Sequence, residues 1–285
     1  MRAEKVYSSL DKEFELDRLQ EDEWSLLDLG EHMTENFRET RKGLALDNTE
    51  EVHKVYTAVF PSNRVLDYLL ATEERNILLF THHPMNWYPD EGGVPFRNIP
   101  MEYLKRLKER EISYYAIHVP LDKIGAYGTT SSLARVLDIE TEKEFFEYYG
   151  VLVGIIGKTE QKSLFNIAKQ VEKTLGHRIK IWEYGSSEVP DQRVAVVAGG
   201  GNDPDVAQGI VDAEVKTFIT GITQKNPDWE PSLKFHEICE ENEINVIGGT
   251  HYSTEKFACI AVQKFFEALG LSSEFVEDEP NFLDY

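Results

Sequence analysis

The sequence predicts an α/β fold, made of two similar α/β lobes with mostly parallel sheets and flanking helices. Short apolar runs alternate with helix-like segments after Lys42, which is the pattern of parallel strands joined by crossover helices. The order of these elements repeats approximately once along the chain, as an internal duplication would produce. A length of 285 residues is enough for two compact units, because one domain usually occupies roughly 150 residues.

The first 42 residues are expected to form a helical segment, 1–42, packed on the first lobe. Residues 11–39 contain large apolar side chains, such as Trp24 and Phe37, among many acidic ones. This mixture is typical of an amphipathic helix that lies over the body of a protein. We assign this segment no chemical role.

The first lobe, residues 43–149, is expected to alternate strands and helices. Strands are predicted from β-branched and aromatic apolar runs, and helices from apolar residues at helical spacing. In chain order these segments are the strand 55–60, the helix 64–71, the strand 76–81, the helix 101–110 and the strand 113–118.

The second lobe, residues 150–285, is expected to repeat this plan. Its matching segments are the strand 193–198, the helix 203–211, the strand 215–220, the helix 231–241 and the strand 244–249. Additional strand–helix–strand material is predicted at 150–157, 163–176 and 178–184, and a helix at 256–269 precedes a last short strand in the acidic tail. In both lobes the third strand runs into a loop that bears a histidine, His118 or His251.

Composition excludes several classes of protein. Fifty-one acidic residues against thirty basic ones give a net charge of −21, which repels phosphate backbones and disfavours direct nucleic-acid binding. Cys239 and Cys259 are too few for a disulfide framework or a four-thiolate zinc site, and they suit a reducing cytoplasm. The charged start of the chain and the short apolar runs predict neither export nor membrane insertion.

The first candidate site is Thr81-His82-His83-Pro84, which follows the apolar run NILLF. Two adjacent imidazoles at a strand exit point in different directions. They therefore suit two metal ions, or one ion and a substrate, better than a single chelate. A solvated polar loop is the alternative interpretation of such a pair taken alone.

The second candidate site is HVPLD at 118–122, which also follows an apolar strand. Pro120 fixes a bend, and Asp122 then supplies a hard carboxylate that can bridge two cations. The alternative is a turn whose aspartate caps the following segment.

The third candidate site is GTHYSTE at 249–255. Ser253 or Thr254 is expected to cap the helix that follows, which would place Glu255 in its first turn and His251 just outside it. Both side chains could then converge on one point. A purely capping role for Glu255 is the alternative.

All three candidate sites fall at predicted strand exits, where ligands bind in an open parallel sheet. Imidazoles together with Asp122 and Glu255 suit zinc, iron(II) or manganese, which accept mixed nitrogen and oxygen ligands. We therefore expect loops of both lobes to meet at a metal site between them.

The three motifs resemble those of the Nif-three-like dinuclear metal-centre proteins, some of which are named GTP cyclohydrolase I type 2. THHP is similar to the family's paired-histidine segment, HVPLD to its H-x-x-L-D segment and GTHYSTE to its G-H-x-x-T-E segment. The likeness extends through GLALDNTEEVHKV, RVAVVAGGG and TFITG, and so covers most of the chain from about Gly43 onward.

This resemblance implies a site with two divalent metal ions per chain and with Asp122 as a bridge. The implied ligands are His82, His83, Asp122, His251 and Glu255. It also implies a ring-shaped homohexamer whose metal sites face an internal cavity, and a small-molecule substrate that could be a purine nucleotide.

The chain departs from the family pattern at two places. It reads FRETRKGL where the family often has W-D-N before its G-L, which puts any substrate role of that segment in doubt. After TFITG, Ile222 stands where the family commonly has an acidic residue, which removes one candidate general acid.

Two further features remain outside this ligand set. His118 stands four residues before Asp122, and we interpret it as a catalytic residue that shuttles protons or as a group that supports the ligands. Gly199, Gly200 and Gly201 could cradle phosphate, but Asp203 beside them favours a tight turn.

The sequence therefore predicts a dinuclear metal-binding protein that acts as a metal-dependent hydrolase of a small molecule. One alternative is a metal-binding regulatory or protein-interaction factor without catalytic turnover. Another is a factor associated with nucleic acid, against which the acidic composition counts.

Overall fold

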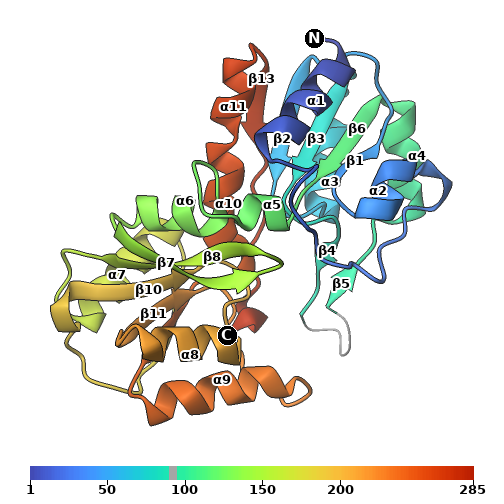
Figure 1. Ribbon diagram of the computed structural model, residues 1–285. Helices are drawn as coiled ribbons and strands as arrows, with labels where there is room; N and C mark the ends of the chain where they lie inside the picture. Colours follow the sequence, from blue (N-terminus) through green and yellow to red (C-terminus); the bar gives the residue numbers. More distant parts are fainter. Residues whose placement is uncertain (90–94) are drawn as a thin grey trace. The chain divides into compact units, whose positions relative to one another are not determined.

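The computed structural model describes residues 1–89 and 95–285, which form two compact units (Figure 1). Unit 1 comprises Met1–Leu121 and Cys259–Glu279, and unit 2 comprises Asp122–Ala258 and Pro280–Tyr285. These boundaries differ from those of the predicted lobes, because the predicted boundary between residues 149 and 150 falls inside unit 2. The C-terminal strand also belongs to unit 1, since it pairs with a strand near the start of the chain.

Unit 1 contains a five-stranded sheet in the order β1-β6-β3-β2-β13. The strands are β1 (Gly43–Leu46), β2 (Lys54–Ala58), β3 (Ile77–Thr81), β6 (Ile112–Ala116) and β13 (Ser272–Phe275). All neighbours are parallel except β1, which runs antiparallel to β6. Every residue of β3 and β6 is buried, as expected for parallel strands that are covered on both faces.

Helices cover both faces of this sheet. One face packs against α3 (Asn63–Ala71) and α4 (Met101–Glu109), whose apolar residues join the core with those of β3 and β6. The other face carries α1 (Ala3–Glu13), visible in Figure 1, and α11 (Gln263–Ala268). There the ring of Phe80 lies 6.1 Å from that of Phe14 and 5.8 Å from that of Phe266.

The amphipathic helix predicted over residues 11–39 is largely wrong. α1 ends at Glu13, and only a 3-10 turn (Gly30–His32) and α2 (Glu35–Thr40) follow before β1. Glu15 and Trp24 have positive φ values of 51° and 42°, which an α-helix does not accommodate. The segment is nevertheless packed on the first unit, since Trp24 and Phe37 are buried in its core.

Unit 2 contains a six-stranded sheet in the order β7-β8-β10-β11-β12-β9. The strands are β7 (Glu140–Tyr148), β8 (Val151–Lys158), β9 (Lys180–Trp182), β10 (Arg193–Val197), β11 (Thr217–Thr220) and β12 (Asn245–Gly248). β10, β11 and β12 are parallel, and the other pairs are antiparallel. β7 was not predicted, because it is charged and mostly exposed and has little apolar pattern.

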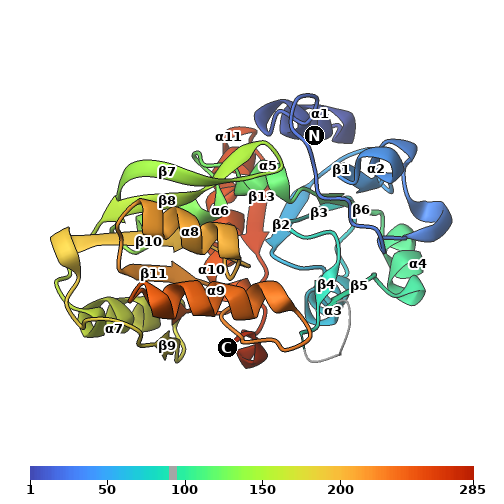
Figure 2. The ribbon, with the colours of Figure 1, turned by 60° about the horizontal axis from the view of Figure 1, so that its bottom comes forward.

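Helices also cover both faces of the second sheet. α6 (Thr129–Val136) and α7 (Leu164–Leu175) pack on one face. α8 (Pro204–Asp212) and α9 (Glu230–Glu241) lie side by side on the other, as Figures 1 and 2 show. The remaining elements are β4 (Asn86–Trp87), β5 (Phe96–Arg97), α5 (Val119–Asp122), α10 (His251–Ala261) and the 3-10 turns Pro190–Gln192 and Phe282–Asp284.

The predicted repeat is visible in the topology of the two units. Unit 1 runs β1-β2-α3-β3-α4-β6, and unit 2 runs β9-β10-α8-β11-α9-β12. The spatial orders β1-β6-β3-β2 and β9-β12-β11-β10 correspond strand for strand, including the antiparallel first strand. An internal duplication explains this correspondence.

Among the described residues, no helix has both the length and the apolar character that crossing a membrane would need.

Candidate metal centre

The turn that carries His82 and His83 is an extension of the unit 1 sheet. Beyond the end of β3, His82 and His83 donate their backbone N–H groups to Ala58 and Val59, over 3.3 and 2.9 Å. The carbonyl of His83 accepts hydrogen bonds from the hydroxyls of Thr81 (2.7 Å) and Tyr114 (3.1 Å). These bonds fix the backbone at the strand exit.

Burial keeps the Tyr114 hydroxyl protonated, because it raises the pKa of this phenol far above its ordinary value. The hydroxyl therefore remains a donor to the His83 carbonyl at any physiological pH.

Neighbouring groups fix both imidazoles. His82 donates its Nδ1–H to the carbonyl of Ile117 over 3.2 Å, which leaves the ring lone pair on Nε2. His83 is stacked on Phe60, with ring centroids 4.5 Å apart and planes inclined by 20°. Trp24 meets the same imidazole edge-on at 5.9 Å. Both histidines are almost completely buried, with 0% and 1% exposed.

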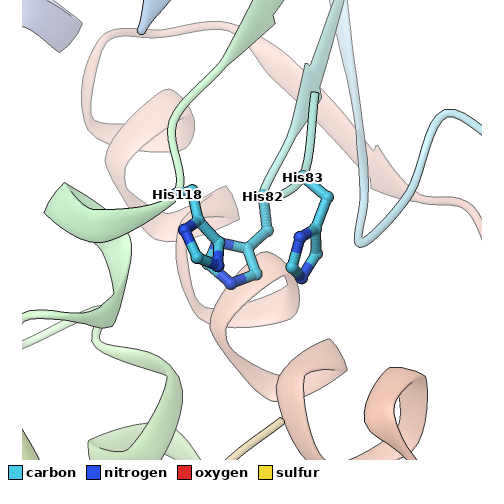
Figure 3. A group of neighbouring side chains, drawn as sticks. All are labelled: His82, His83 and His118. Atoms are coloured by element: carbon cyan, nitrogen blue, oxygen red, sulfur yellow. The ribbon is translucent and has the colours of Figure 1, made fainter. Parts of the chain in front are cut away.

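His118 joins these two residues from the end of β6. Its ring centroid lies 4.8 Å from that of His82 and 4.7 Å from that of His83. One nitrogen from each of the three rings lies within 4.8 Å of the others. Figure 3 shows the three imidazoles gathered at the strand ends. The sequence-predicted residues of unit 1 therefore come together.

A buried carboxylate, which the sequence analysis missed, holds the His118 backbone. Glu21 accepts the N–H groups of His118 and Val119 over 3.0 and 3.1 Å, and its Oε1 lies 3.7 Å from His118 Nδ1. The Glu21 side chain is only 2% exposed. Glu21 lies in the N-terminal segment to which no chemistry was assigned, and one glutamate among many acids gave no signal in the sequence.

The three histidines are chemically suited to a metal ion. Neutral imidazole nitrogens are good ligands for zinc, iron(II) and manganese, and the His82 tautomer already directs a lone pair away from the backbone. The aromatic rings around the imidazoles also restrict the access of water. This favours coordination of an ion by the imidazoles over their hydration.

Asp122 and the pair His251–Glu255 lie in unit 2. The Asp122 carboxylate, 9% exposed, accepts a hydrogen bond from the Thr129 hydroxyl over 2.7 Å. His251 and Glu255 are one helical turn apart on α10, and Nε2 lies 3.2 Å from Oε1. This geometry confirms that the two side chains converge.

The start of the helix was predicted wrongly. α10 begins at His251, so His251 and Glu255 both lie inside it, and neither Ser253 nor Thr254 is its cap. Thr250, with φ of 64°, precedes the helix, and its hydroxyl accepts the N–H of Ser253 over 3.3 Å. The apolar pattern begins only at Phe257, which is why the first turn was placed too late.

Gly199 provides the space that the Glu255 carboxylate occupies. A Cβ atom at this position would lie 2.0 Å from Glu255 Oε1 and 3.3 Å from His251 Cδ2, and φ is +71°. The Gly199 N–H donates to the Thr254 hydroxyl over 2.9 Å, and the Gly201 N–H to that of Thr220 over 3.1 Å. These bonds are those of a tight turn, as the sequence favoured.

The fold and these side chains define an α/β protein with histidine and carboxylate groups that could hold metal ions. The chain belongs to the Duf34/NIF3 (NGG1p interacting factor 3) family, whose profile matches residues 32–281.

Curated relatives share most of their length with this chain. A GTP cyclohydrolase 1 type 2 homolog of Pyrococcus horikoshii is 30% identical over 84% of this chain and 90% of its own length. A homolog of the same name in Archaeoglobus fulgidus is 29% identical over 85% of this chain and 91% of its own length.

Solved structures share the fold. The protein ybgI matches with a TM-score of 0.75 at 20% identity, over 99% of this chain and 100% of the other. TTHA1606 of Thermus thermophilus matches with a TM-score of 0.69 at 24% identity, again over 99% and 100%. HcgD of Methanocaldococcus jannaschii matches with a TM-score of 0.68 at 20% identity, over 98% of each chain.

Proposed function

We propose that this protein is a dinuclear metal-dependent hydrolase that acts on a small molecule of the purine nucleotide class. In this proposal two divalent ions are held by His82, His83, Asp122, His251 and Glu255, with Asp122 as the bridging ligand. The observation that carries it is the buried pair His82 and His83, with the half-buried His118 beside them, because imidazoles gathered at one sheet edge suit both metal binding and proton transfer.

The repeat supports a contribution from both units. His82 and His83 follow β3, the third strand of the unit 1 repeat, and the His251–Glu255 pair follows β12, the fourth strand of the unit 2 repeat. Both lie at carboxyl ends of parallel strands, where α/β proteins bind ligands. Two of the three points at which the chain passes between the units lie within α5 and α10, the helices that carry Asp122 and Glu255.

Two divalent ions, when bound, supply Lewis acidity that lowers the pKa of water and polarises the bond to be hydrolysed. The protein's own residues orient the reaction. His118 is proposed to move a proton at an imidazole nitrogen during turnover, and Glu21 holds its backbone and lies beside Nδ1. The rings of Phe60 and Trp24 keep water from His83.

The substrate class rests on the names of the curated relatives, which are GTP cyclohydrolase 1 type 2 homologs. A net charge of −21 opposes an anionic substrate at long range. Cations at the site would offset this repulsion locally, which makes hydrolysis of a nucleotide dependent on bound metal.

Metal analysis of the purified protein tests the proposal. We expect two equivalents of a divalent metal per chain in protein purified without added metal, and loss of most of it in Asp122→Ala. The purified protein should also hydrolyse GTP in a chelator-sensitive manner. Metal without turnover on any purine nucleotide would favour a regulatory metal-binding protein instead, and absence of metal from both proteins would contradict the proposal.

A second variant separates the role of His118 from that of the ligands. His118→Gln is expected to keep nearly the full metal content while turnover falls about 100-fold, because a general acid–base group typically contributes 10²–10⁴-fold. Loss of metal in His118→Gln would instead identify His118 as a ligand.

The family resemblance adds two proposals about the assembled protein. We propose a homohexamer, with metal sites facing an internal cavity, that works in the cytoplasm. Light scattering after size-exclusion chromatography tests the assembly, for which six times the chain mass of 32.7 kDa is expected. A monomeric mass would contradict it.

A further inference from the structure

We propose that Asp284, close to the C-terminal end of the sequence, is a positioning residue for His251 and thereby for metal binding. The inference rests on the proposed function, in which His251 and Glu255 are metal ligands. Asp284 lies outside the region matched by the family profile, which ends at residue 281.

Asp284 is bonded directly to the first residue of the ligand-bearing helix. Its Oδ2 accepts the backbone N–H of His251 over 2.8 Å, and the residue is only 1% exposed. α10 begins at this N–H, so the carboxylate caps a helix from a distant part of the chain.

The main chain of Asp284 binds a second strand exit. Its carbonyl accepts the N–H groups of Thr223 and Gln224 over 2.7 and 2.9 Å. These two residues follow β11, whereas His251 follows β12, the neighbouring strand. One residue therefore ties together the two loops at this edge of the unit 2 sheet.

The charge of Asp284 suits this position. The N-terminus of α10 carries a partial positive charge from its aligned peptide groups, and an eleven-residue helix is long enough for that field to develop. Thr250 caps the N–H of Ser253, and Asp284 caps that of His251, so the first turn receives two separate caps.

A shift of this first turn would move both proposed ligands. His251 is the first residue of α10, and Glu255 lies one turn further along the same helix. Metal ligands must be held to within fractions of an ångström, and outer groups that orient them typically change metal affinity by 10–100-fold when removed.

The tail has other anchors, so Asp284 can be changed without detaching it. The Tyr285 hydroxyl donates to the carbonyl of Arg178 over 2.8 Å, and the ring of Phe282 lies 5.5 Å from that of His177. The Arg178 guanidinium lies 4.8 Å from the Phe282 ring centroid.

The test is titration of the metal-free full-length protein with two ions. Binding of Co²⁺ is monitored by the visible absorption of the bound ion, and binding of Zn²⁺ is monitored by calorimetry. We expect Asp284→Ala to weaken binding by about 10–100-fold. Asp284→Asn keeps an oxygen that can accept the His251 N–H, and it should bind within about fivefold of the wild type.

Ser163→Ala is the matched control. The Ser163 hydroxyl caps α7 in the same unit by accepting the N–H of Asn166, so this variant also removes a helix cap. It should lower the thermal midpoint comparably to Asp284→Ala but leave the metal affinity and the Co²⁺ spectrum unchanged. A weakening of metal binding in Ser163→Ala equal to that in Asp284→Ala would contradict the inference.

The outcomes separate the two proposals. A wild-type protein that binds neither ion overturns the proposed function. Wild-type binding together with unchanged affinity in Asp284→Ala overturns only the role of Asp284.

If Asp284→Ala does not fold, Asp284→Glu replaces it, because the charge is kept while the carboxylate moves by one methylene. Weaker binding by Asp284→Glu than by Asp284→Asn supports the inference, and equal binding overturns it.

Discussion

Gly199 shows how a residue without a side chain can determine the position of a buried carboxylate. It combines a left-handed backbone with direct contact to the space filled by Glu255. Any larger residue incurs the strain of a positive φ and must also displace the carboxylate.

We predict that Gly199→Ala binds much less metal than the wild type and is less stable by about 2–4 kcal/mol, because backbone strain and a steric clash add. Metal analysis and thermal unfolding measure the two effects. Gly150→Ala is the control, since Gly150 has φ of +82° and no atom within 4 Å of an added Cβ. Gly150→Ala should lose stability through backbone strain alone and keep its metal content. Equal metal loss in both variants would argue against the contact with Glu255.

His236 makes the stability of unit 2 sensitive to pH. Its Nε2–H donates to the Thr223 carbonyl over 2.9 Å, and its Nδ1 lies 3.0 Å from the Tyr184 hydroxyl. Burial lowers the pKa of His236 to about 4. The folded protein therefore keeps this imidazole neutral at a pH where the unfolded chain protonates it.

The sign of the pH effect follows from proton binding. Between pH 6.5 and 4 the unfolded state binds more protons at this residue, so the free energy of unfolding falls as the pH falls. The contribution is about 3 kcal/mol and is fully present above roughly pH 6.5. Urea unfolding at about pH 7 and about pH 4.5 should show a steeper loss for the wild type than for His236→Gln. Parallel losses would contradict this account of His236.

The ligand candidates could be predicted at the level of single residues, because histidines and acids directly after apolar strands are rare and chemically distinct. Glu21 and Asp284 could not. They act through backbone N–H groups that are far away in sequence, at separations of 97 and 33 residues. Nothing in their local sequence distinguishes them from the many other acids of this chain.

Among the elements, the N-terminal segment is held by side chains more than by regular structure. Trp24 packs edge-on against His83 and His118, and Glu21 accepts the backbone N–H groups at the start of α5. Trp24 and Phe37 of this segment lie in the core of unit 1. The predicted helical conformation was wrong, because burial of scattered apolar side chains is compatible with irregular structure as well as with a helix.

We predict that Glu21→Gln destabilises the protein by about 1–3 kcal/mol, since an amide cannot accept both N–H bonds as a carboxylate does and a buried donor is left poorly matched. Chemical denaturation measures the change. Glu13→Gln, which alters an exposed glutamate at the end of α1, should change the stability by less than about 0.5 kcal/mol. Equal stability of the Glu21→Gln and wild-type proteins would show that the bonds from Glu21 contribute nothing.

The strands of the repeat were predicted well, because parallel strands covered on both faces are continuous apolar runs. Edge strands were predicted less well. β1 is short, and β7 is charged, so hydrogen bonds to a neighbour define these strands better than their own pattern does.

Across the whole molecule, bound metal should stabilise the fold. A ligand that binds only the folded state at a concentration about 100 times its dissociation constant adds about 2.7 kcal/mol. Removal of metal with a chelator should therefore lower the thermal midpoint, and Zn²⁺ should restore it. The same treatment should leave Asp122→Ala unchanged, and a chelator effect of equal size in that variant would place the metal elsewhere.

The repeat itself could be predicted from the order of elements, but the boundaries of the units could not. The last strand, Ser272–Phe275, pairs with β2, Lys54–Ala58, across most of the chain, and no local pattern records such pairing. The same holds for the arrangement of the proposed ligands, which come from three separate motifs along the chain.

Anomalous X-ray diffraction from crystals of the metal-loaded protein would decide whether both units contribute to one metal centre. We predict two metal peaks per chain, about 4 Å apart or less, with His82 and His83 and also His251 and Glu255 among their ligands, and Asp122 between them. Peaks bound by residues of one unit alone, or crystals of loaded protein without any metal peak near His82, would contradict a shared dinuclear site.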